Sequence, residues 1–417
     1  MPKTLITHIG TLAGIHPRET LRLSGQEMKH MGVIHDAWLL TDDNRIAAFG
    51  DMDQLDALDA SPTLTIDAKG GTVLPCWCDP HTHLVYAGSR EGEFEDKIRG
   101  LSYAEIARRG GGILNSADRL HEMSEDELVE ATLQRLNEMM ARGTGCVEIK
   151  NGYGLNTTDE LKMLRVVRRL KELTPIRIIA TFLGAHAVGR AYTGRQAEYV
   201  DLVINEMIPA VAEEQLADYI DVFCDEGFFT PDETARILEA GARYGMRPKI
   251  HACELKSSGG VEVGVAHDAL SIDHLESASD HDLDLLAHSP AMPTLLPGTS
   301  FFLNMPYARG RQLIDRGLAI ALATDCNPGS TPSADMKFVV SLACIKMRLE
   351  PAEALNAATL NAAYAMGLSH DYGSIAVGKR ANLQITKPIP SLAYIPYAYT
   401  RDIVSKVMIE GEMVSIS

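Results

Sequence analysis

The sequence contains no apolar run near the roughly 18 residues that a membrane-spanning helix requires. Its first ten residues lack the charged start, the long apolar core and the cleavage site of a signal peptide. We therefore predict a cytoplasmic protein that has no membrane partner. The seven cysteines are an odd number scattered along the chain, which excludes a fully paired disulfide framework and favours reduced, buried thiols.

Basic residues are also in deficit. The formal net charge of −17 argues against nucleic acid or an anionic membrane surface as a partner, and a local Arg or His must hold any anionic substrate. What is present fits a folded protein, with 46% hydrophobic residues and 34 glycines. A length of 417 residues accommodates one barrel of about 250 residues and a smaller domain.

The two ends of the chain share a pattern of short strands and turns. Strand-like segments occur at residues 5–7, 36–40, 45–50 and 63–67, and again at residues 381–385 and 403–409. Neither end is long enough to bury a good core alone. We therefore predict one small composite β-sandwich domain, formed by residues 1–70 and 375–417, beside a middle domain of residues 71–374.

The middle domain alternates between short apolar segments and amphipathic segments of helical period. The predicted strands are residues 72–76, 146–150, 177–183, 219–224, 248–252, 269–273, 292–295 and 319–324. The predicted helices are residues 125–142, 158–173, 199–212, 231–244, 280–287 and 308–316. Eight strands with helical connections indicate an α/β fold of the (β/α)₈ TIM-barrel type. A doubly wound open sheet is the main alternative, but no Gly-x-Gly-x-x-Gly follows a first strand.

Polar side chains follow the predicted strands at their carboxyl ends, where barrels of this type place their active sites. His81 and His83 come after the first strand and share one face of it, because side chains in a strand alternate with a period of two. His251 and Asp325 end the fifth and eighth strands. A lone terminal histidine is more often structural, but recurrence at several strand ends favours a site. Three imidazoles and one carboxylate leave a position for water on one metal ion, as hydrolysis requires.

Three groups are candidates for the proton chemistry, and the division of labour among them stays open. Glu254 lies three residues beyond His251 and is placed to act as a general base without ligating the metal. His274 is a candidate to hydrogen-bond the water or the carbonyl oxygen, and Asp325 to share the base role. This ligand set accepts Zn²⁺ or Fe²⁺. A site with two metal ions would be expected to have a bridging lysine at the end of the fourth strand. Lys150 instead ends the second strand, so we predict one metal ion. The expected role of Lys150 is an ion pair beneath the site.

Four stretches extend this pattern beyond a metal site. They are Asp79 to Arg90 (DPHTHLVYAGSR), Glu148 to Leu155 (EIKNGYGL), Phe182 to His186 (FLGAH) and Asp325 to Ser330 (DCNPGS). In these stretches, and over nearly its whole length, the chain resembles the amidohydrolase superfamily and, more narrowly, the imidazolonepropionase family. That resemblance implies the third step of histidine degradation. In this step 4-imidazolone-5-propanoate is hydrolysed to N-formimidoyl-L-glutamate, and metal-bound hydroxide attacks the ring carbonyl.

The resemblance also implies a set of substrate contacts, namely Arg90, Tyr153, His186, Glu254, Asn327, Gly329 and Ser330. The planar guanidinium of Arg90 suits the substrate's propionate, although a surface ion pair with Glu91 or Glu93 is the alternative. Tyr153 lies between two glycines whose backbone freedom lets its ring enter the pocket, unless it only packs the loop. Residue 151 is Asn where the family usually has Ser, which we expect to tune activity rather than abolish it.

Other interpretations of the sequence stay open. His186 is also placed to cap a helix, and the turn from Asn327 to Ser330 to serve only as a strand-to-helix turn. The glycines at 110–112 suggest a lid over the mouth of the barrel. A deaminase or a dihydropyrimidinase-like enzyme shares the metal ligands, and an inactive barrel that serves as a scaffold is a further class. We predict a small-molecule substrate and a homodimer.

Overall fold

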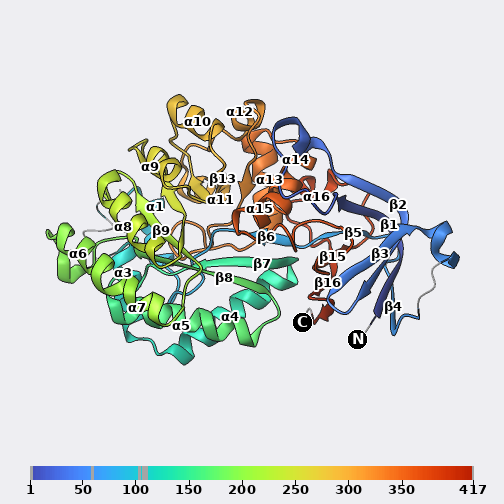
Figure 1. The fold of residues 1–417 in the computed structure, drawn as a ribbon, viewed down its shortest axis with the longest axis horizontal. Coiled ribbons are helices and arrows are strands. Elements are labelled where there is room, and N and C mark those ends of the chain that lie inside the picture. The colour runs from blue at the N-terminus through green and yellow to red at the C-terminus, as the bar shows by residue number, and fades with distance from the viewer. Residues whose placement is uncertain (1–2, 58–60, 102–104, 106–110, 416–417) are drawn as a thin grey trace.

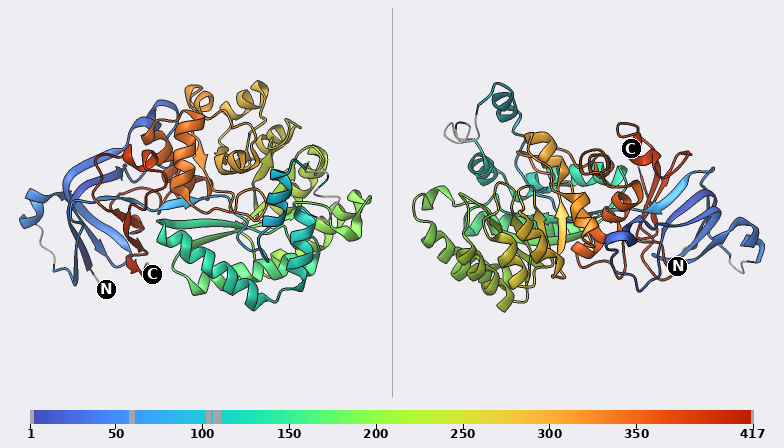
Figure 2. Two further views of the ribbon diagram at one scale, coloured as in Figure 1. Left: turned by 180° about the vertical axis from the view of Figure 1, so that it is seen from behind. Right: turned by 90° about the horizontal axis from the view of Figure 1, so that it is seen from above.

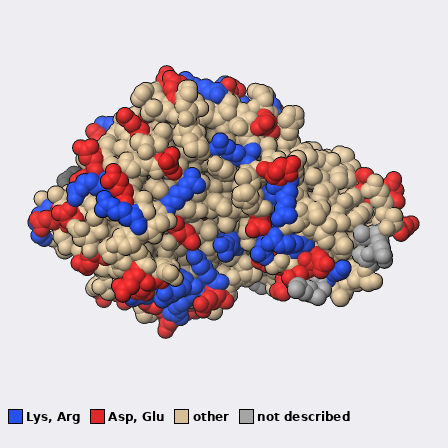
Figure 3. All heavy atoms as spheres, viewed as in Figure 1, with Lys and Arg blue, Asp and Glu red and all other residues tan. Residues whose placement is uncertain are grey.

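The computed structural model describes residues 3–57, 61–101, 105 and 111–415. A barrel and a smaller β domain lie side by side (Figures 1 and 2), and both chain ends contribute strands to the β domain. Acidic and basic side chains are interspersed on the face drawn in Figure 3. Within the described ranges, no helix combines the length and the apolar character needed to cross a membrane.

The β domain is one sheet of eight strands, in the order β17-β16-β15-β5-β1-β2-β3, with β4 paired to β1. The strands from the start of the chain are β1 (Lys3–Ile15), β2 (Gly32–Asp42), β3 (Arg45–Asp51), β4 (Leu64–Asp67) and β5 (Thr72–Pro75). Those from the end are β15 (Leu383–Thr386), β16 (Val404–Ile409) and β17 (Glu412–Val414). Side chains from both ends, such as Ile6 and Leu383, share one apolar cluster. The predicted composite β domain is confirmed.

The barrel sheet is parallel throughout, in the order β14-β13-β12-β11-β9-β8-β7-β6, with β10 paired to β9. Its strands are β6 (Trp77–Asp79), β7 (Thr144–Lys150), β8 (Arg177–Ala185), β9 (Tyr219–Cys224), β10 (Arg247–Pro248), β11 (Ile250–Ala252), β12 (Ser271–His274), β13 (Met292–Leu295) and β14 (Ala321–Leu322). A parallel bridge between Thr82 and Cys326 closes the ring. Thr324 also donates to the Asp79 carboxylate through its backbone N (3.0 Å) and its Oγ1 (2.6 Å). The (β/α)₈ prediction is confirmed.

The six predicted helical segments correspond to α4 (Glu125–Ala141), α5 (Thr157–Leu173), α6 and α7 (Gln196–Leu202 and Ile208–Glu213), α8 (Pro231–Arg243), α10 (Asp280–Ala287) and α12 (Gly310–Asp315). A π-helical turn, η4 (Val203–Met207), joins α6 to α7. Capping boxes fix the start of α4 at Ser124 and of α8 at Thr230, and each satisfies backbone N–H groups that a helix start otherwise leaves unpaired.

Further helices had no clear signal in the sequence. They are α1 (Glu91–Ile98), α3 (Ile113–Glu122), α9 (Gly260–Ala266), α11 (Pro297–Leu303), α13 (Met336–Met347), α14 (Pro351–Ala357), α15 (Leu360–Ala365) and α16 (Tyr394–Tyr397). Short 3₁₀ turns occur at η1 (Gly25–Lys29), η2 (Met52–Ala57) and η3 (Arg190–Tyr192). Of these, α1 matters most for function, because it begins directly after Arg90.

The expectation that residues 72–76 form the first barrel strand is wrong. That segment contains β5, which pairs with β1 and β15 in the β domain, whereas β6 opens the barrel. The backbone N of Cys76 donates to Asn382 O, and that of Trp77 donates to Gly143 O, both at 2.9 Å. The chain thus leaves one sheet and enters the other within two residues. Residues 71–78 are buried throughout, so their apolar pattern does not reveal the change.

Charged side chains fill the barrel interior between β7, β9 and β12. The Nζ atom of Lys150 lies 2.7 Å from Asp221 Oδ2, 2.9 Å from Glu148 Oε1 and 3.4 Å from Asp273 Oδ2. Lys249 pairs with the other oxygen of Glu148. All five side chains are fully buried, and each charge has an opposite partner, as a buried charge requires. The predicted role of Lys150, an ion pair beneath the site, agrees with this geometry.

Candidate active site

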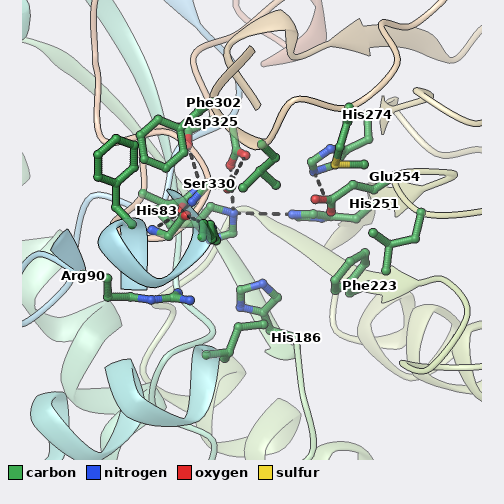
Figure 4. A pocket seen from close by; sticks show the side chains of 18 of the residues that line it. His83, Arg90, His186, Phe223, His251, Glu254, His274, Phe302, Asp325 and Ser330 are labelled. Carbon is green, nitrogen blue, oxygen red and sulfur yellow. Dashed lines mark hydrogen bonds and ion pairs between the residues drawn. The ribbon is translucent and has the colours of Figure 1, made fainter. Parts of the chain in front are cut away.

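The four predicted metal ligands come together at the carboxyl ends of the barrel strands. The Nε2 atoms of His81 and His83 lie 3.6 and 3.7 Å from Oδ1 of Asp325. The Nε2 atom of His83 also lies 3.5 Å from Nε2 of His251 (Figure 4). All four side chains are buried. Burial lowers the pKa of each of the three imidazoles well below the ordinary value, so the rings are neutral, which is the form that ligates metals.

One carboxylate inside the barrel orients the ring of His81, and a second lies beside the ring of His251. Nδ1 of His81 lies 2.7 Å from Oδ2 of Asp273, and Nδ1 of His251 lies 3.0 Å from Oδ2 of Asp221. Burial acts to raise the pKa of Asp273, but the charges of Lys150 and Lys249 outweigh burial and leave this pKa below its usual value. An ionised carboxylate only accepts hydrogen bonds, so Nδ1 of His81 donates. The lone pair of that ring therefore lies on Nε2, towards the cluster.

The facing nitrogens fit a bound cation. Nδ1 of His83 lies 3.4 Å from the carbonyl oxygen of Asn151 and can only donate to it, which leaves a lone pair on Nε2 of His83 as well. Across 3.5 Å it meets Nε2 of His251, whose Nδ1 faces a carboxylate. Nε2 of His81 is buried and has no hydrogen-bond partner among the described residues. Converging lone pairs repel unless a cation lies among them, so this donor set suits a divalent metal ion.

His274 lies beside this cluster but has a different charge state. Its Nε2 is 3.6 Å from Oε2 of Glu254 (Figure 4). Its Nδ1 is 3.4 Å from Oε2 of Glu276. Burial acts to lower the pKa of His274, but Glu254 and Glu276, together with Asp325, raise it well above the ordinary value. An imidazolium has no free lone pair, so we predict that His274 donates a hydrogen bond here, although one of its ring nitrogens lies within 4.8 Å of those of His81 and His251. Burial raises the pKa of Glu254 to about 7, close to the optimum for a general base at neutral pH.

A cavity of about 870 Å³ opens beside the cluster. All seven residues that were predicted to contact substrate line it, namely Arg90, Tyr153, His186, Glu254, Asn327, Gly329 and Ser330. Further lining residues had no sequence signal, among them Phe94, Lys97, Phe223 and Phe302. In the close view, Arg90 reaches towards His83 and His186 from the loop before α1 (Figure 4). The cavity thus brings a guanidinium and the histidine cluster into one space.

Arg90 forms an ion pair with Glu93, at 2.6 Å between Nη2 and Oε2. The pair lies in the cavity wall rather than on the surface, since the two side chains are only 6% and 11% exposed. Gly329 packs against the guanidinium so closely that a Cβ on residue 329 would lie 2.3 Å from Nη1 of Arg90. A glycine at position 329 is therefore needed for Arg90 to reach this position.

The loop that carries Tyr153 is held by one buried carboxylate. Oε1 of Glu160 accepts hydrogen bonds from the backbone N of Gly154 (2.9 Å) and of Leu155 (2.7 Å), and Oε2 accepts from that of Gly152 (2.9 Å). The carbonyl oxygen of Gly152 in turn accepts from Nδ1 of His186 at 3.0 Å. Burial raises the pKa of Glu160 to about 7 against these three bonds. One side chain therefore sets the position of two predicted substrate contacts.

The turn after β14 uses most of its polar groups internally. Oδ1 of Asn327 accepts from the backbone N of Gly329 and of Ser330, both at 2.8 Å. Nδ2 of Asn327 donates to the carbonyl oxygen of Asp325 at 2.7 Å, and Ser330 Oγ donates to Oδ2 of Asp325 at 3.1 Å. The amide of Asn327 thus shapes the turn, while the hydroxyl of Ser330 faces the predicted ligand Asp325.

Several supporting residues escaped the sequence analysis. Asp221, Glu148 and Lys249 are charged residues inside or between apolar strands, and that mismatch is the signal that could have identified them. Glu160 sits in the first turn of a helix and looks like an ordinary N-terminal acidic residue, so no local signal marks it. The sequence predicted a lid at residues 110–112. Residue 110 lies outside the described residues, and Gly112 is the N-cap of α3.

Comparison with known proteins identifies the family. The model of the amidohydrolase family matches residues 72–414. The chain belongs to the amidohydrolase family. This amidohydrolase is 52% identical to an imidazolonepropionase of Christiangramia forsetii, over 98% of this chain and 99% of that relative. It is 51% identical to an imidazolonepropionase of Flavobacterium johnsoniae, over 99% of this chain and the whole of that relative.

The fold of the amidohydrolase also matches solved structures. One is an adenosine deaminase from Xanthomonas campestris with bound zinc, with a TM-score of 0.72 and 18% identity, over 99% of this chain and 92% of that chain. At this sequence identity the match supports the fold and nothing further. Family membership and the histidine–aspartate cluster together indicate that the amidohydrolase is a hydrolase that uses a divalent metal ion and a small-molecule substrate.

Proposed function

We propose that this amidohydrolase is an imidazolonepropionase, which hydrolyses the cyclic amide C–N bond of 4-imidazolone-5-propanoate to give N-formimidoyl-L-glutamate in histidine degradation. One observation carries the proposal. A single cavity joins the histidine–aspartate cluster to Arg90, in a chain that matches imidazolonepropionases over its full length. The substrate has a ring amide to be opened and an anionic propionate to be held, and the cavity offers a group for each.

His81, His83, His251 and Asp325 would hold one Zn²⁺ or Fe²⁺ ion. When bound, such an ion lowers the pKa of a water ligand and polarises a carbonyl oxygen. The pairing of Lys150 with Glu148, Asp221 and Asp273 supports a single ion, because its ammonium is already used in the barrel interior. The choice between zinc and iron is left to metal analysis, since this donor set accepts both.

The charge of each side chain in the cavity determines the role that we assign to it. Arg90 holds the propionate, and Tyr153 and His186 border the ring. His274, as an imidazolium, donates a hydrogen bond to the carbonyl oxygen. Glu254, 3.6 Å from His274, takes the proton of the attacking water on a carboxylate oxygen and returns it to the ring nitrogen as the C–N bond breaks. The carbonyl carbon gains the water oxygen and becomes a carboxylate, and the second proton of the water is released to solvent.

A turnover assay with metal-loaded protein tests the proposal. We expect loss of the imidazolone absorbance, formation of N-formimidoyl-L-glutamate and one metal ion per chain. Dihydropyrimidines, and aminated purines and pyrimidines, serve as competing substrates for other amidohydrolase activities. Turnover of one of these and not of the imidazolone would assign a different activity, and no turnover of any would favour a scaffold role. The cytoplasmic location and the homodimer stay predictions.

A further inference from the structure

A second cation lies in the same cavity wall as Arg90. Lys97 lines the cavity from the last turn of α1, seven residues beyond Arg90, which is the N-cap of this helix. The ammonium of Lys97 donates to the carbonyl oxygen of Gly329 at 3.1 Å. The guanidinium of Arg90 packs against the same Gly329. Both charges therefore meet at one residue of the turn after β14.

The charges at this end of the cavity are not balanced. Glu93 lies between the two cations on α1 and pairs with Arg90. Its other oxygen accepts from the backbone N of Gly112 (3.0 Å) and from Nδ2 of Asn115 (3.2 Å). Across the described part of the chain, no carboxylate forms an ion pair with Lys97. Two positive charges and one negative charge leave a net +1, which one carboxylate neutralises.

The surroundings of Lys97 strengthen its attraction for an anion. Its ammonium lies 5.7 Å from the ring centre of Phe302, which stacks on Phe94 at 5.3 Å. An aromatic wall excludes water, so a charge beside it is less screened than one in solvent. Burial lowers the pKa of Lys97, and the charge of Arg90 lowers it further. Glu93 acts in the opposite direction, but Lys97 has no ion-pair partner in the described part of the chain, so its ammonium is available to an arriving anion.

We propose that Lys97 binds the carboxylate of the substrate together with Arg90, so that the anionic end of the molecule lies between Arg90 at the N-cap of α1 and Lys97 in its last turn. The inference rests on the proposed function and adds a specificity residue to it. The carboxylate of 4-imidazolone-5-propanoate displaces no charge partner of Lys97, whereas at Arg90 it shares the guanidinium with Glu93. Because Arg90 is already paired with Glu93, it attracts the substrate carboxylate only in part. Lys97 supplies the remaining electrostatic attraction.

The test compares two substrates in wild type and in K97M, with K97Q as a second neutral variant. One substrate is 4-imidazolone-5-propanoate, and the other is the corresponding propanamide, which has the same ring but no charge. We expect the neutral variants to raise KM for the carboxylate about 10- to 100-fold, with kcat nearly unchanged. KM for the propanamide should stay within about twofold, and K97R should restore the low KM for the carboxylate.

Controls separate this inference from the function on which it rests. K171M removes an exposed lysine that pairs with Asp218 on the surface, and should change neither KM nor kcat. Metal content and melting temperature should match wild type in all variants. If the wild-type enzyme turns over the carboxylate and the neutral variants keep its low KM, the assignment of Lys97 is overturned and the function stands. If wild type turns over neither compound, the proposed function and the inference both fall.

Discussion

Nδ1 of His81 donates a 2.7 Å hydrogen bond to Oδ2 of Asp273, and the same oxygen lies 3.4 Å from the ammonium of Lys150. Asp273 thus links the proposed metal ligand to the ion network in the barrel. Carboxylates in this position fix the ring orientation and raise the basicity of the coordinating nitrogen, and their loss usually costs 10- to 100-fold in metal affinity. We expect a fall of about this size in D273N, measured by chelator competition.

The control for D273N is D284N on the exposed face of α10, where the carboxylate pairs with Arg316. It should leave metal affinity unchanged. D273N also leaves Lys150 with two carboxylates in place of three, so its melting temperature is recorded without metal. Wild-type metal affinity in a folded D273N protein would show that the hydrogen bond to His81 does not support metal binding.

Replacement of Glu254 tests the proposed general base. E254Q keeps the size and hydrogen-bonding capacity of the side chain but cannot accept a proton at neutral pH. We expect kcat to fall about 10²- to 10⁴-fold, with metal content and substrate binding retained. Activity near wild type would refute the base role of Glu254 and transfer it to Asp325.

Replacement of Glu160 tests whether its carboxylate positions the loop that carries Tyr153. The amide of E160Q still offers one oxygen, but its NH₂ group opposes a backbone N–H that now donates to a carboxylate oxygen. The loop should shift, so we expect KM to rise about tenfold with metal content unchanged. E198Q, which removes an exposed partner of Arg195, is the matched control. A KM equal to wild type in a folded E160Q protein would contradict the positioning role.

Stability should depend on pH through His16, at the contact between the end of β1 and α14. Nε2 of His16 donates to Oδ1 of Asn356 at 3.2 Å, because Nδ2 of Asn356 already donates to Met28 O. Burial lowers the pKa of His16 below 6.5, although the hydrogen bond to Asn356 acts in the opposite direction. Between the folded and the unfolded pKa, only the unfolded chain takes up the proton, so acidification below pH 6.5 destabilises the native state.

Urea unfolding at pH 7 and at pH 5 checks this dependence. The difference in unfolding free energy between the two pH values should be smaller in H16Q, whose amide NH₂ still donates to Asn356 but does not titrate. At pH 7 His16 is neutral in the folded state and mostly neutral in the unfolded state, so it makes only a small pH-dependent contribution there. An equal loss of stability on acidification in wild type and H16Q would rule out His16 as the source.

The barrel could be predicted because parallel strands are buried on both faces and appear as short apolar runs, each followed by polar residues. His81, His83, His251 and Asp325 follow such runs, so their convergence follows from the topology. The segment from Gly71 to Cys78 could not be divided correctly, because it is equally buried in either sheet. Its division depends on Asn382 and Gly143, which are distant in sequence and pair with Cys76 and Trp77.

The supporting parts of the site were beyond sequence reasoning for a different reason. The charge of Asp221 is paired by Lys150, 71 positions away, and Asp273 reaches the same ammonium from β12. Nothing local to either aspartate indicates this partner. Lys97 looks like a solvated helix residue until the fold places the turn with Gly329 beside it. Properties that arise from side chains brought together by several strands require the fold before they can be inferred.

The passage from β5 into β6 has a consequence for the order of assembly during synthesis. β5 needs β15 as one of its two neighbours, and β6, which follows within two residues, leads directly to His81 and His83. A nascent chain therefore has its first two ligands early, but β5 lacks its neighbour β15 until residue 386 has been made, and β16 and β17 of the same sheet follow later still. A chain that ends after Asp325 but before β15 contains every proposed ligand, yet lacks the strand that pairs with β5 next to the first two.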